Sequence, residues 1–194
     1  MRSGEPPSSS VFTSVRERRL WTWTLVVVVA IYSTLGLART LAGVLREEGM
    51  LVASFALGMV LVGATVLVLG LRGRPGGTEI GIVLGIATAY YMVMVRMALP
   101  EERTHLIEYG VVAVFIHEAL KERSSQGRFV PVPALIAVAV ASVVGVIDEC
   151  IQAVIPNRVF DTEDILFNVL AAVMAVASSA ALSWGRGRRP ARRR

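Results

Sequence analysis

Several residue types are scarce in this chain. It has one cysteine among its 194 residues, Cys150, so it can form neither an intramolecular disulfide nor a thiolate metal site. Charged residues make up only 18% of the sequence, and none occurs between residues 51 and 71. Hydrophobic residues, by contrast, make up 54%. Uncharged apolar runs of about 20 residues are typical of membrane-spanning helices, so the composition indicates a membrane protein.

Six apolar segments are long enough, at about 1.5 Å per residue, to approach the thickness of a hydrocarbon core of about 30 Å. Segment 105–120 is the weakest, because it is short and contains Glu108, His117 and Glu118. The sequence therefore predicts an all-α, polytopic membrane helical bundle of about six transmembrane helices, with three helices in residues 20–99 and three in 100–184. The predicted spans are residues 20–38, 50–71, 80–99, 105–120, 132–155 and 165–184.

Basic residues are concentrated on one side of this predicted topology. With six spans both termini share a side, and 15 of the 20 Lys and Arg residues fall on it. Because cytoplasmic loops carry the excess of Lys and Arg, both termini are predicted to be cytoplasmic. The two polar segments described below then fall at the outer face of the membrane.

The ends of the chain are predicted to lie outside the membrane. Residues 1–19, rich in Ser and Pro, are predicted to be a disordered cytoplasmic segment. The apolar run from Leu20 is long for a signal peptide, which favours an uncleaved first helix. Residues 185–194 carry six Arg and no aromatic residue that could stack on a base. We therefore expect this tail to bind anionic lipid headgroups and not nucleic acid.

The first polar segment covers residues 100–109 and includes Arg103. On a helix His105, Glu108 and Tyr109 lie at i, i+3 and i+4 and share a face. Glu108 is expected about one turn inside the membrane surface. An isolated charge there costs several kcal/mol, so this carboxylate needs a partner, a proton or water.

The second polar segment begins near the end of the fifth predicted span. Asp148 and Gln152 lie at i and i+4, while Glu149 points about 100° away and needs another partner. Pro156 is predicted to end the helix in a turn. Arg158 would lie in that turn, with its guanidinium free to hold a carboxylate or phosphate.

The same segment continues into the sixth predicted span. Asp161, Asp164 and Asn168 lie at i, i+3 and i+7 and form one stripe. A structural interpretation of part of this stripe is that Asp161 or Thr162 caps the helix, with Asp164 near the N3 position. Capping or solvation is favoured for Asp161, Thr162 and Glu163. Function is favoured for Glu108, Glu149 and Asn168, which lie deeper in the membrane.

His117 and Glu118 form half of a metalloprotease motif. Lys121 stands where the second histidine is required, so the motif is absent and no metal site is predicted. Interfacial side chains are the favoured interpretation of this pair.

The two polar segments together resemble the VanZ-like family of bacterial membrane proteins, over about residues 100–175. Ala171 and Ala175 stand where the family pattern has glycine. The resemblance implies a multi-pass protein of the bacterial cytoplasmic membrane, in a family named for a member linked to teicoplanin resistance. The residues that carry the resemblance are Glu102, Arg103, His105, Tyr109, Asp148, Glu149, Gln152, Pro156, Arg158, Asp161, Asp164 and Asn168.

Three functions remain open on the sequence alone. The first is a binding protein whose outer polar residues engage a cell-envelope ligand or membrane protein partner. The second is an intramembrane enzyme acting on a lipid or envelope precursor, with Glu108 or Glu149 as base and His105 as proton shuttle. A divalent ion bound by carboxylates and imidazole is an open variant of this second function. The third is a small proton-coupled transporter. The sequence identifies neither a cofactor nor the ligand.

Overall fold

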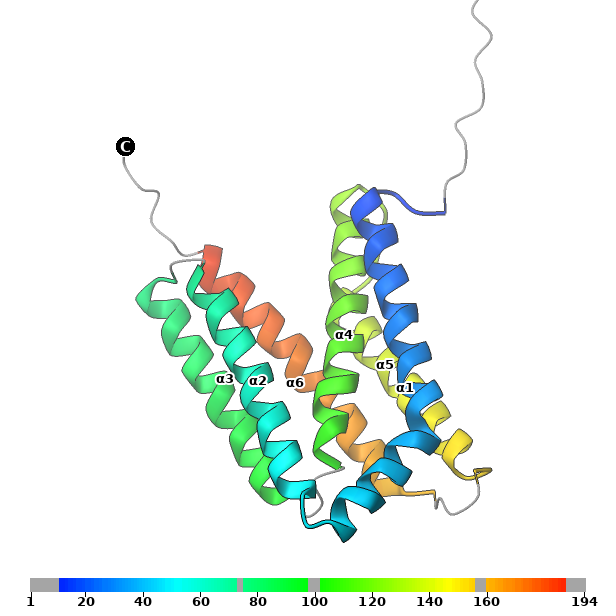
Figure 1. Cartoon of the computed structure of the whole chain (residues 1–194). Coiled ribbons are helices and arrows are strands. Elements are labelled where there is room, and N and C mark those ends of the chain that lie inside the picture. Colours follow the sequence, from blue (N-terminus) through cyan, green and yellow to red (C-terminus); the bar gives the residue numbers. More distant parts are fainter. Residues whose placement is uncertain (1–10, 73–74, 98–101, 156–159, 188–194) are drawn as a thin grey trace, which may run out of the picture.

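The computed structural model describes residues 11–72, 75–97, 102–155 and 160–187, and these residues form six helices. Figure 1 shows the helices running alternately up and down, so that α1 begins and α6 ends at the same end of the bundle. We call this the terminal end and the other the distal end. The helices are α1 (Val15–Glu47), α2 (Leu51–Arg72), α3 (Gly77–Arg96), α4 (Glu102–Ser125), α5 (Pro133–Gln152) and α6 (Thr162–Gly187).

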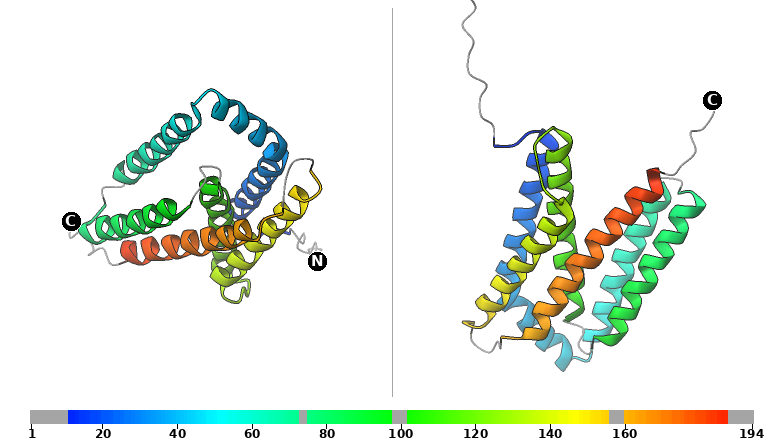
Figure 2. Two further views of the ribbon diagram at one scale, coloured as in Figure 1. Left: turned by 90° about the horizontal axis from the view of Figure 1, so that it is seen from below. Right: turned by 180° about the vertical axis from the view of Figure 1, so that it is seen from behind.

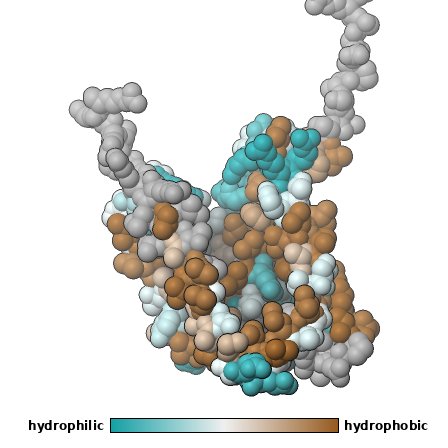
Figure 3. All heavy atoms as spheres, viewed as in Figure 1, coloured by the Kyte–Doolittle hydropathy of each residue, from teal (hydrophilic) through white to brown (hydrophobic). Residues whose placement is uncertain are grey.

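Four helices contain a stretch long and apolar enough to cross a membrane: Val15–Leu37 within α1, and the whole of α3, α5 and α6. Within the described residues α2 contributes only the shorter apolar stretch Leu51–Leu61, and α4 does not qualify. The α4 helix carries charged residues in its last two turns, among them Glu118, Lys121 and Glu122. Hydrophobic side chains cover most of the face visible in Figure 3 between the two ends of the bundle. The chain is a membrane protein with four supported spans, and the predicted total of about six remains a prediction.

Local signals in the sequence explain several helix boundaries. Helix α1 starts five residues before the predicted span, because the Ser14 side chain accepts a hydrogen bond from the Glu17 N–H and caps it. Gly49 and Gly127 end α1 and α4 in the left-handed conformation, with φ of 69° and 82°. The residue after each donates to the carbonyl five residues back, which is the Schellman arrangement. Pro133 opens α5 at a position where its missing N–H has no cost.

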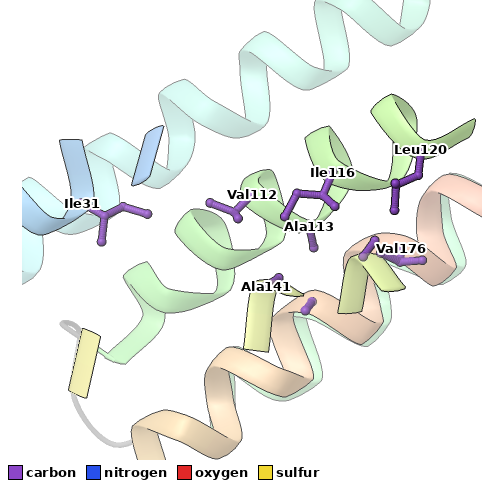
Figure 4. Packing of buried hydrophobic residues seen from close by; sticks show 9 residues of the cluster. Ile31, Val112, Ala113, Ile116, Leu120, Ala141 and Val176 are labelled. Carbon is purple, nitrogen blue, oxygen red and sulfur yellow. The ribbon is translucent and has the colours of Figure 1, made fainter. Parts of the chain in front are cut away.

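The α4 helix lies at the centre of the bundle and packs against α1, α5 and α6, while α3 packs on α6. The main contact of α2 is with α1, and Figure 2 shows α2 standing apart from α4, α5 and α6. The central core, shown in Figure 4, combines branched residues such as Ile116 and Val176 with fully buried alanines such as Ala113 and Ala141. Small residues let helix backbones approach closely, which is the main source of helix association in lipid.

Two glycines permit this approach. A Cβ atom on Gly110 of α4 would lie 3.4 Å from the Cβ of Ala175 on α6. A Cβ atom on Gly145 of α5 would lie 2.8 Å from the Cβ of Asn168, which real Cβ atoms do not tolerate. The alanine at position 175 is therefore compatible with close packing, because the facing helix supplies the glycine.

Charged side chains join α1 to α4 at the terminal end. Glu17, which is fully buried, accepts hydrogen bonds from Arg123 Nη1 at 2.9 Å and from the N–H and hydroxyl of Thr13, both at 2.6 Å. Nearby, Arg16 pairs with Glu122 at 2.7 Å and with Glu118 at 3.0 Å. These pairs fix the start of α1 on the last two turns of α4.

Glu118 extends the same network to a third helix. It also pairs with Lys121 at 2.8 Å and accepts a hydrogen bond from the Ser179 hydroxyl of α6 at 3.3 Å. The sequence-based interpretation of His117 and Glu118 as interfacial side chains is incomplete, because His117 is buried and Glu118 holds three helices together.

The contact at Gly145 predicts a specific instability. Gly145→Ala must displace Asn168, and we expect a loss of about 1–3 kcal/mol from overpacking, reduced by about 1 kcal/mol of gained helix propensity. Gly81→Ala is the control, because nothing lies within 4 Å of a Cβ at Gly81. Thermal unfolding in detergent should show a lower melting temperature for Gly145→Ala and an unchanged or higher one for Gly81→Ala. Equal behaviour of the two variants would contradict the close approach of α5 and α6.

The ion pair between Glu17 and Arg123 predicts a second destabilising substitution. Arg123→Ala leaves the buried Glu17 carboxylate without its cation, so we expect a destabilisation of about 1–3 kcal/mol. Adding Glu17→Gln to Arg123→Ala should recover part of this loss, because the unpaired charge is then removed. Chemical denaturation in detergent measures both, with exposed Arg128→Ala as the control for general loss of a cation. A destabilisation that Glu17→Gln does not relieve would assign another role to Arg123.

Candidate functional site

The polar segments predicted from the sequence meet at the distal end of the bundle. The first turns of α4, the last turn of α5 and the first turns of α6 all lie at this end, opposite to the start of α1 (Figure 1). We call the fully buried polar side chains gathered here the polar cluster: Tyr109, Asp148, Glu149, Gln152 and Asn168.

Two neighbouring carboxylates form the centre of the polar cluster. Asp148 and Glu149 are both 0% exposed. The Gln152 Nε2 donates to Asp148 Oδ2 and to Glu149 Oε1, each at 3.1 Å. Among the described residues neither carboxylate has a basic side chain within ion-pair distance. One amide group therefore serves two buried acidic side chains, and Asp148 Oδ1 is left without a well-formed hydrogen bond.

Glu149 joins the end of α5 to the start of α6. Its second oxygen, Oε2, accepts a hydrogen bond from the backbone N–H of Asp161 at 3.1 Å. The Asp161 Oδ1 in turn accepts from the Glu163 N–H at 2.8 Å, so Asp161 caps α6 as the structural interpretation expected. Both oxygens of Glu149 are thus occupied by donors from the chain.

Four buried polar atoms of the polar cluster lack a well-formed hydrogen bond within the described part of the chain, although the Tyr109 hydroxyl and the Asp148 carboxylate lie close enough to interact. They are Tyr109 OH, Asp148 Oδ1, and the Nδ2 and Oδ1 atoms of Asn168. Buried polar groups in native proteins are nearly always satisfied, and each exception costs about 1–3 kcal/mol. The polar cluster therefore offers two donors and three acceptors, counting the Tyr109 oxygen as both, to a group that is not part of these residues.

Tyr32 of α1 also reaches this region, and sequence reasoning missed it. Its hydroxyl donates to the Val144 carbonyl at 2.7 Å, and Asp148 acts electrostatically on both Tyr32 and Tyr109. The only signal in the sequence is a single tyrosine within an apolar span. Such a residue is equally typical of an interfacial aromatic, so the pattern could not identify it.

His105 and Asp164 lie at the partly exposed edge of the polar cluster. Their side chains are 12% and 19% exposed, and His105 Nε2 lies 3.8 Å from Asp164 Oδ2. The His105 ring stacks on Tyr109, with centroids 5.8 Å apart and planes inclined by 8°. Both residues act electrostatically on Glu149. They are the described residues through which the polar cluster faces the surface.

The other predicted site residues are not part of the polar cluster as defined above. The Arg103 Nη2 donates to the Met97 carbonyl at 3.2 Å, and its guanidinium lies 5.8 Å from the ring centroid of Phe55, so Arg103 contacts α2 and the end of α3. Glu108 is half-buried and acts electrostatically on Tyr109. Pro156 and Arg158, predicted as a turn and an anion-binding group, lie outside the described residues.

The donor set of the polar cluster favours some ligands over others. Carboxylate oxygens, an amide and a phenol suit groups that both donate and accept, such as hydroxyls, amines and amides. A phosphate offers acceptors only and would face Asp148 and Glu149. Among the described residues no group of three His, Cys, Asp or Glu side chains is arranged to hold a metal ion.

Comparison of the sequence with known protein families finds a match. The family described as VanZ/LLP1 matches residues 80–183, which cover nearly all of α3 and α6 and the whole of α4 and α5. The match confirms the resemblance seen in residues 100–175 and extends it to include α3. Comparison with curated proteins and with solved structures finds no match.

The shared amide of Gln152 predicts the effect of one substitution. Gln152→Glu removes the donor of both carboxylates and adds a third acidic group, so we expect a destabilisation of about 3 kcal/mol. The chain's other glutamine, Gln126, is exposed and donates to Glu122 Oε1 at 3.3 Å. Gln126→Glu should lower stability by no more than about 1 kcal/mol, because the bond that it loses and the like-charge pair that it creates are at the surface. Thermal unfolding at neutral pH measures both. A tolerated Gln152→Glu would mean that the carboxylates do not depend on this amide.

Proposed function

The chain belongs to the VanZ/LLP1 family, and we propose that it is a multi-pass protein of the bacterial cytoplasmic membrane whose polar cluster binds a cell-envelope molecule. Four candidate spans support the membrane location. The strong excess of Lys and Arg at the terminal end supports a cytoplasmic position for that end. The polar cluster then opens toward the outside of the cell.

One observation carries this proposal: the four polar atoms of Tyr109, Asp148 and Asn168 that lack a well-formed hydrogen bond in the described part of the chain. A hydroxyl, amine or amide group of a ligand can satisfy them together, because it donates to Asp148 and accepts from Tyr109 or Asn168. Sugar and peptide portions of envelope precursors carry such groups. A relation to glycopeptide (teicoplanin) resistance is a finer form of the same proposal, in which the ligand is a molecule that such an antibiotic also recognises.

Access to the polar cluster requires movement. Tyr109, Asp148 and Asn168 are 0% exposed, whereas His105 and Asp164 are partly exposed. Displacing the first turn of α6 would break the bond between the Asp161 N–H and Glu149 and uncover the polar cluster. We therefore propose that the ligand enters between the first turns of α4 and α6.

An intramembrane enzyme is the second candidate, and one observation favours it. The Asp148 carboxylate interacts with the buried Tyr109 hydroxyl, and its Oδ1 atom has no well-formed hydrogen bond, which is an arrangement suited to moving a proton. Glu149 is less suited to act as a base, because both of its oxygens already accept hydrogen bonds. In this alternative Asp148 takes the role that the sequence-based hypothesis gave to Glu108 or Glu149.

Tyr109→Phe tests the proposed site directly. The buried hydroxyl lacks a well-formed hydrogen bond in the described part of the chain, so its removal should leave the stability unchanged or raise it by about 1 kcal/mol. Loss of one hydrogen bond should weaken ligand binding by roughly three- to tenfold. Binding is measured as thermal stabilisation in nanodiscs by lipid-linked peptidoglycan precursor, its soluble sugar-peptide portion, and teicoplanin.

Two tyrosines serve as controls. Exposed Tyr91→Phe should change neither stability nor binding. Tyr32→Phe removes the bond to Val144 and should lower stability by about 1 kcal/mol. Equal binding by Tyr109→Phe and the unmodified protein would contradict the site. Product formation from the precursor, lost in Asp148→Asn, would favour the enzyme.

A further inference from the structure

A groove runs between α3 and α6 on the outer surface of the bundle, separate from the polar cluster. It has a volume of about 370 Å³, within the range of about 300–1,000 Å³ that is usual for ligand pockets. Its lining is Met92, Val93 and Arg96 from α3 with Phe167 and Leu170 from α6. The surface of the groove is almost entirely apolar, so Arg96 lines it with the aliphatic part of its side chain and holds its guanidinium outside the groove.

Arg96 places a positive charge at the distal end of the groove. It is the last residue of α3, so it lies at the distal end of the bundle, where the apolar stretch of that helix stops. Its side chain is exposed, and among the described residues no acidic side chain forms an ion pair with it. A cation that ends an apolar groove is complementary to a molecule with an apolar chain and an anionic head.

The membrane around α3 and α6 indicates which molecule binds in the groove. Both α3 and α6 are candidate membrane spans, so their outer surfaces face acyl chains and, at their ends, headgroups. A second protein helix could fill the apolar part but would not by itself satisfy the guanidinium. A phosphate does so, because guanidinium groups form paired hydrogen bonds with it.

We propose that the groove holds an acyl chain of an anionic glycerophospholipid, whose phosphate binds Arg96. The lipid bridges α3 and α6. Val93 and Phe167, which line the groove, also pack against the hydrophobic cluster that contains Tyr109. The bound lipid thus supports the wall behind the polar cluster, and its presence does not depend on what the polar cluster binds.

Photocrosslinking tests this proposal. The full chain is placed in phosphatidylcholine nanodiscs that contain a small fraction of one photoreactive probe lipid. The probe is either phosphatidylglycerol or phosphatidylcholine, and both probes carry the same photoreactive acyl chain. Labelling of the peptides with Met92 and Phe167 is compared with that of exposed Leu57 and Val60 on α2, which report bulk lipid. We expect the phosphatidylglycerol probe to label the groove about fivefold more than the phosphatidylcholine probe, and α2 equally.

Four variants test which part of the groove recognises the lipid. Arg96→Gln should abolish the preference for phosphatidylglycerol, and Arg96→Lys should keep most of it. Arg46→Gln, an exposed arginine in the last turn of α1 at the same end, should leave it unchanged. Met92→Trp, at a side chain that is 60% exposed, should fill the groove and reduce labelling by both probes.

Other outcomes overturn the proposal. Equal labelling of groove and α2 by both probes would mean that the groove holds bulk lipid only. A preference that persists in Arg96→Gln would place the anion elsewhere, and crosslinks between two copies of the chain would assign the groove to an interface. Thermal unfolding of each variant verifies that it folds. If Arg96→Gln does not fold, Arg96→Met tests the charge, because it keeps a long side chain and removes the cation.

Discussion

Close packing of α4, α5 and α6 is the constraint on which the rest of the structure depends. In a bilayer, helices gain little hydrophobic free energy by meeting, because lipid tails are as apolar as leucine. Their association rests on van der Waals contact, which requires small residues such as Gly110, Gly145 and Ala175 at the crossing points. The same closeness removes water from Asp148 and Asn168. The packing that stabilises the bundle therefore also creates its unsatisfied polar atoms.

Buried carboxylates at the two ends of the bundle differ in how fully their hydrogen bonds are satisfied. At the terminal end Glu17 is fully buried, but a guanidinium and two Thr13 groups satisfy it. At the distal end Asp148 and Glu149 share one amide, and four polar atoms of the polar cluster lack a well-formed hydrogen bond within the described residues. Each unpaired atom costs about 1–3 kcal/mol, a large share of a net stability of about 5–15 kcal/mol. Outside the distal end the described residues include one further buried atom of this kind, His117 Nδ1 in the terminal half of α4. The concentration of unsatisfied atoms at the distal end favours function there and a structural role for the other end.

Helical spacing predicted much of the local geometry of the candidate site. The Asp148 and Gln152 spacing places these residues on one face, where they are hydrogen-bonded, and the same rule stacks His105 on Tyr109. The N-cap interpretation of Asp161 is also confirmed. These features could be predicted because they depend on residues within one turn of helix, where covalent geometry fixes the distances.

Contacts between distant segments could not be predicted in this way. The partner of Glu149 is a backbone N–H, which every residue except proline carries and no side-chain pattern marks. Tyr32 and Glu17 depend on the packing of α1, and their partners lie more than 100 residues away. The limited packing of α2 was equally hidden, because its apolar sequence indicates a helix but not the neighbours of that helix.

Asp148 and Glu149 show how adjacent carboxylates acquire different roles from their surroundings. Glu149 uses both oxygens within the chain and so reports the position of α6, since its bond to Asp161 breaks if the first turn of α6 moves. Asp148 keeps one oxygen without a well-formed hydrogen bond in the described part of the chain. Gln152 contacts both, so release of Glu149 would also change the hydrogen bonding of Asp148. Movement of α6 and the chemistry of Asp148 are therefore coupled through a single amide, which gives the polar cluster a physical means to respond to a ligand that displaces α6.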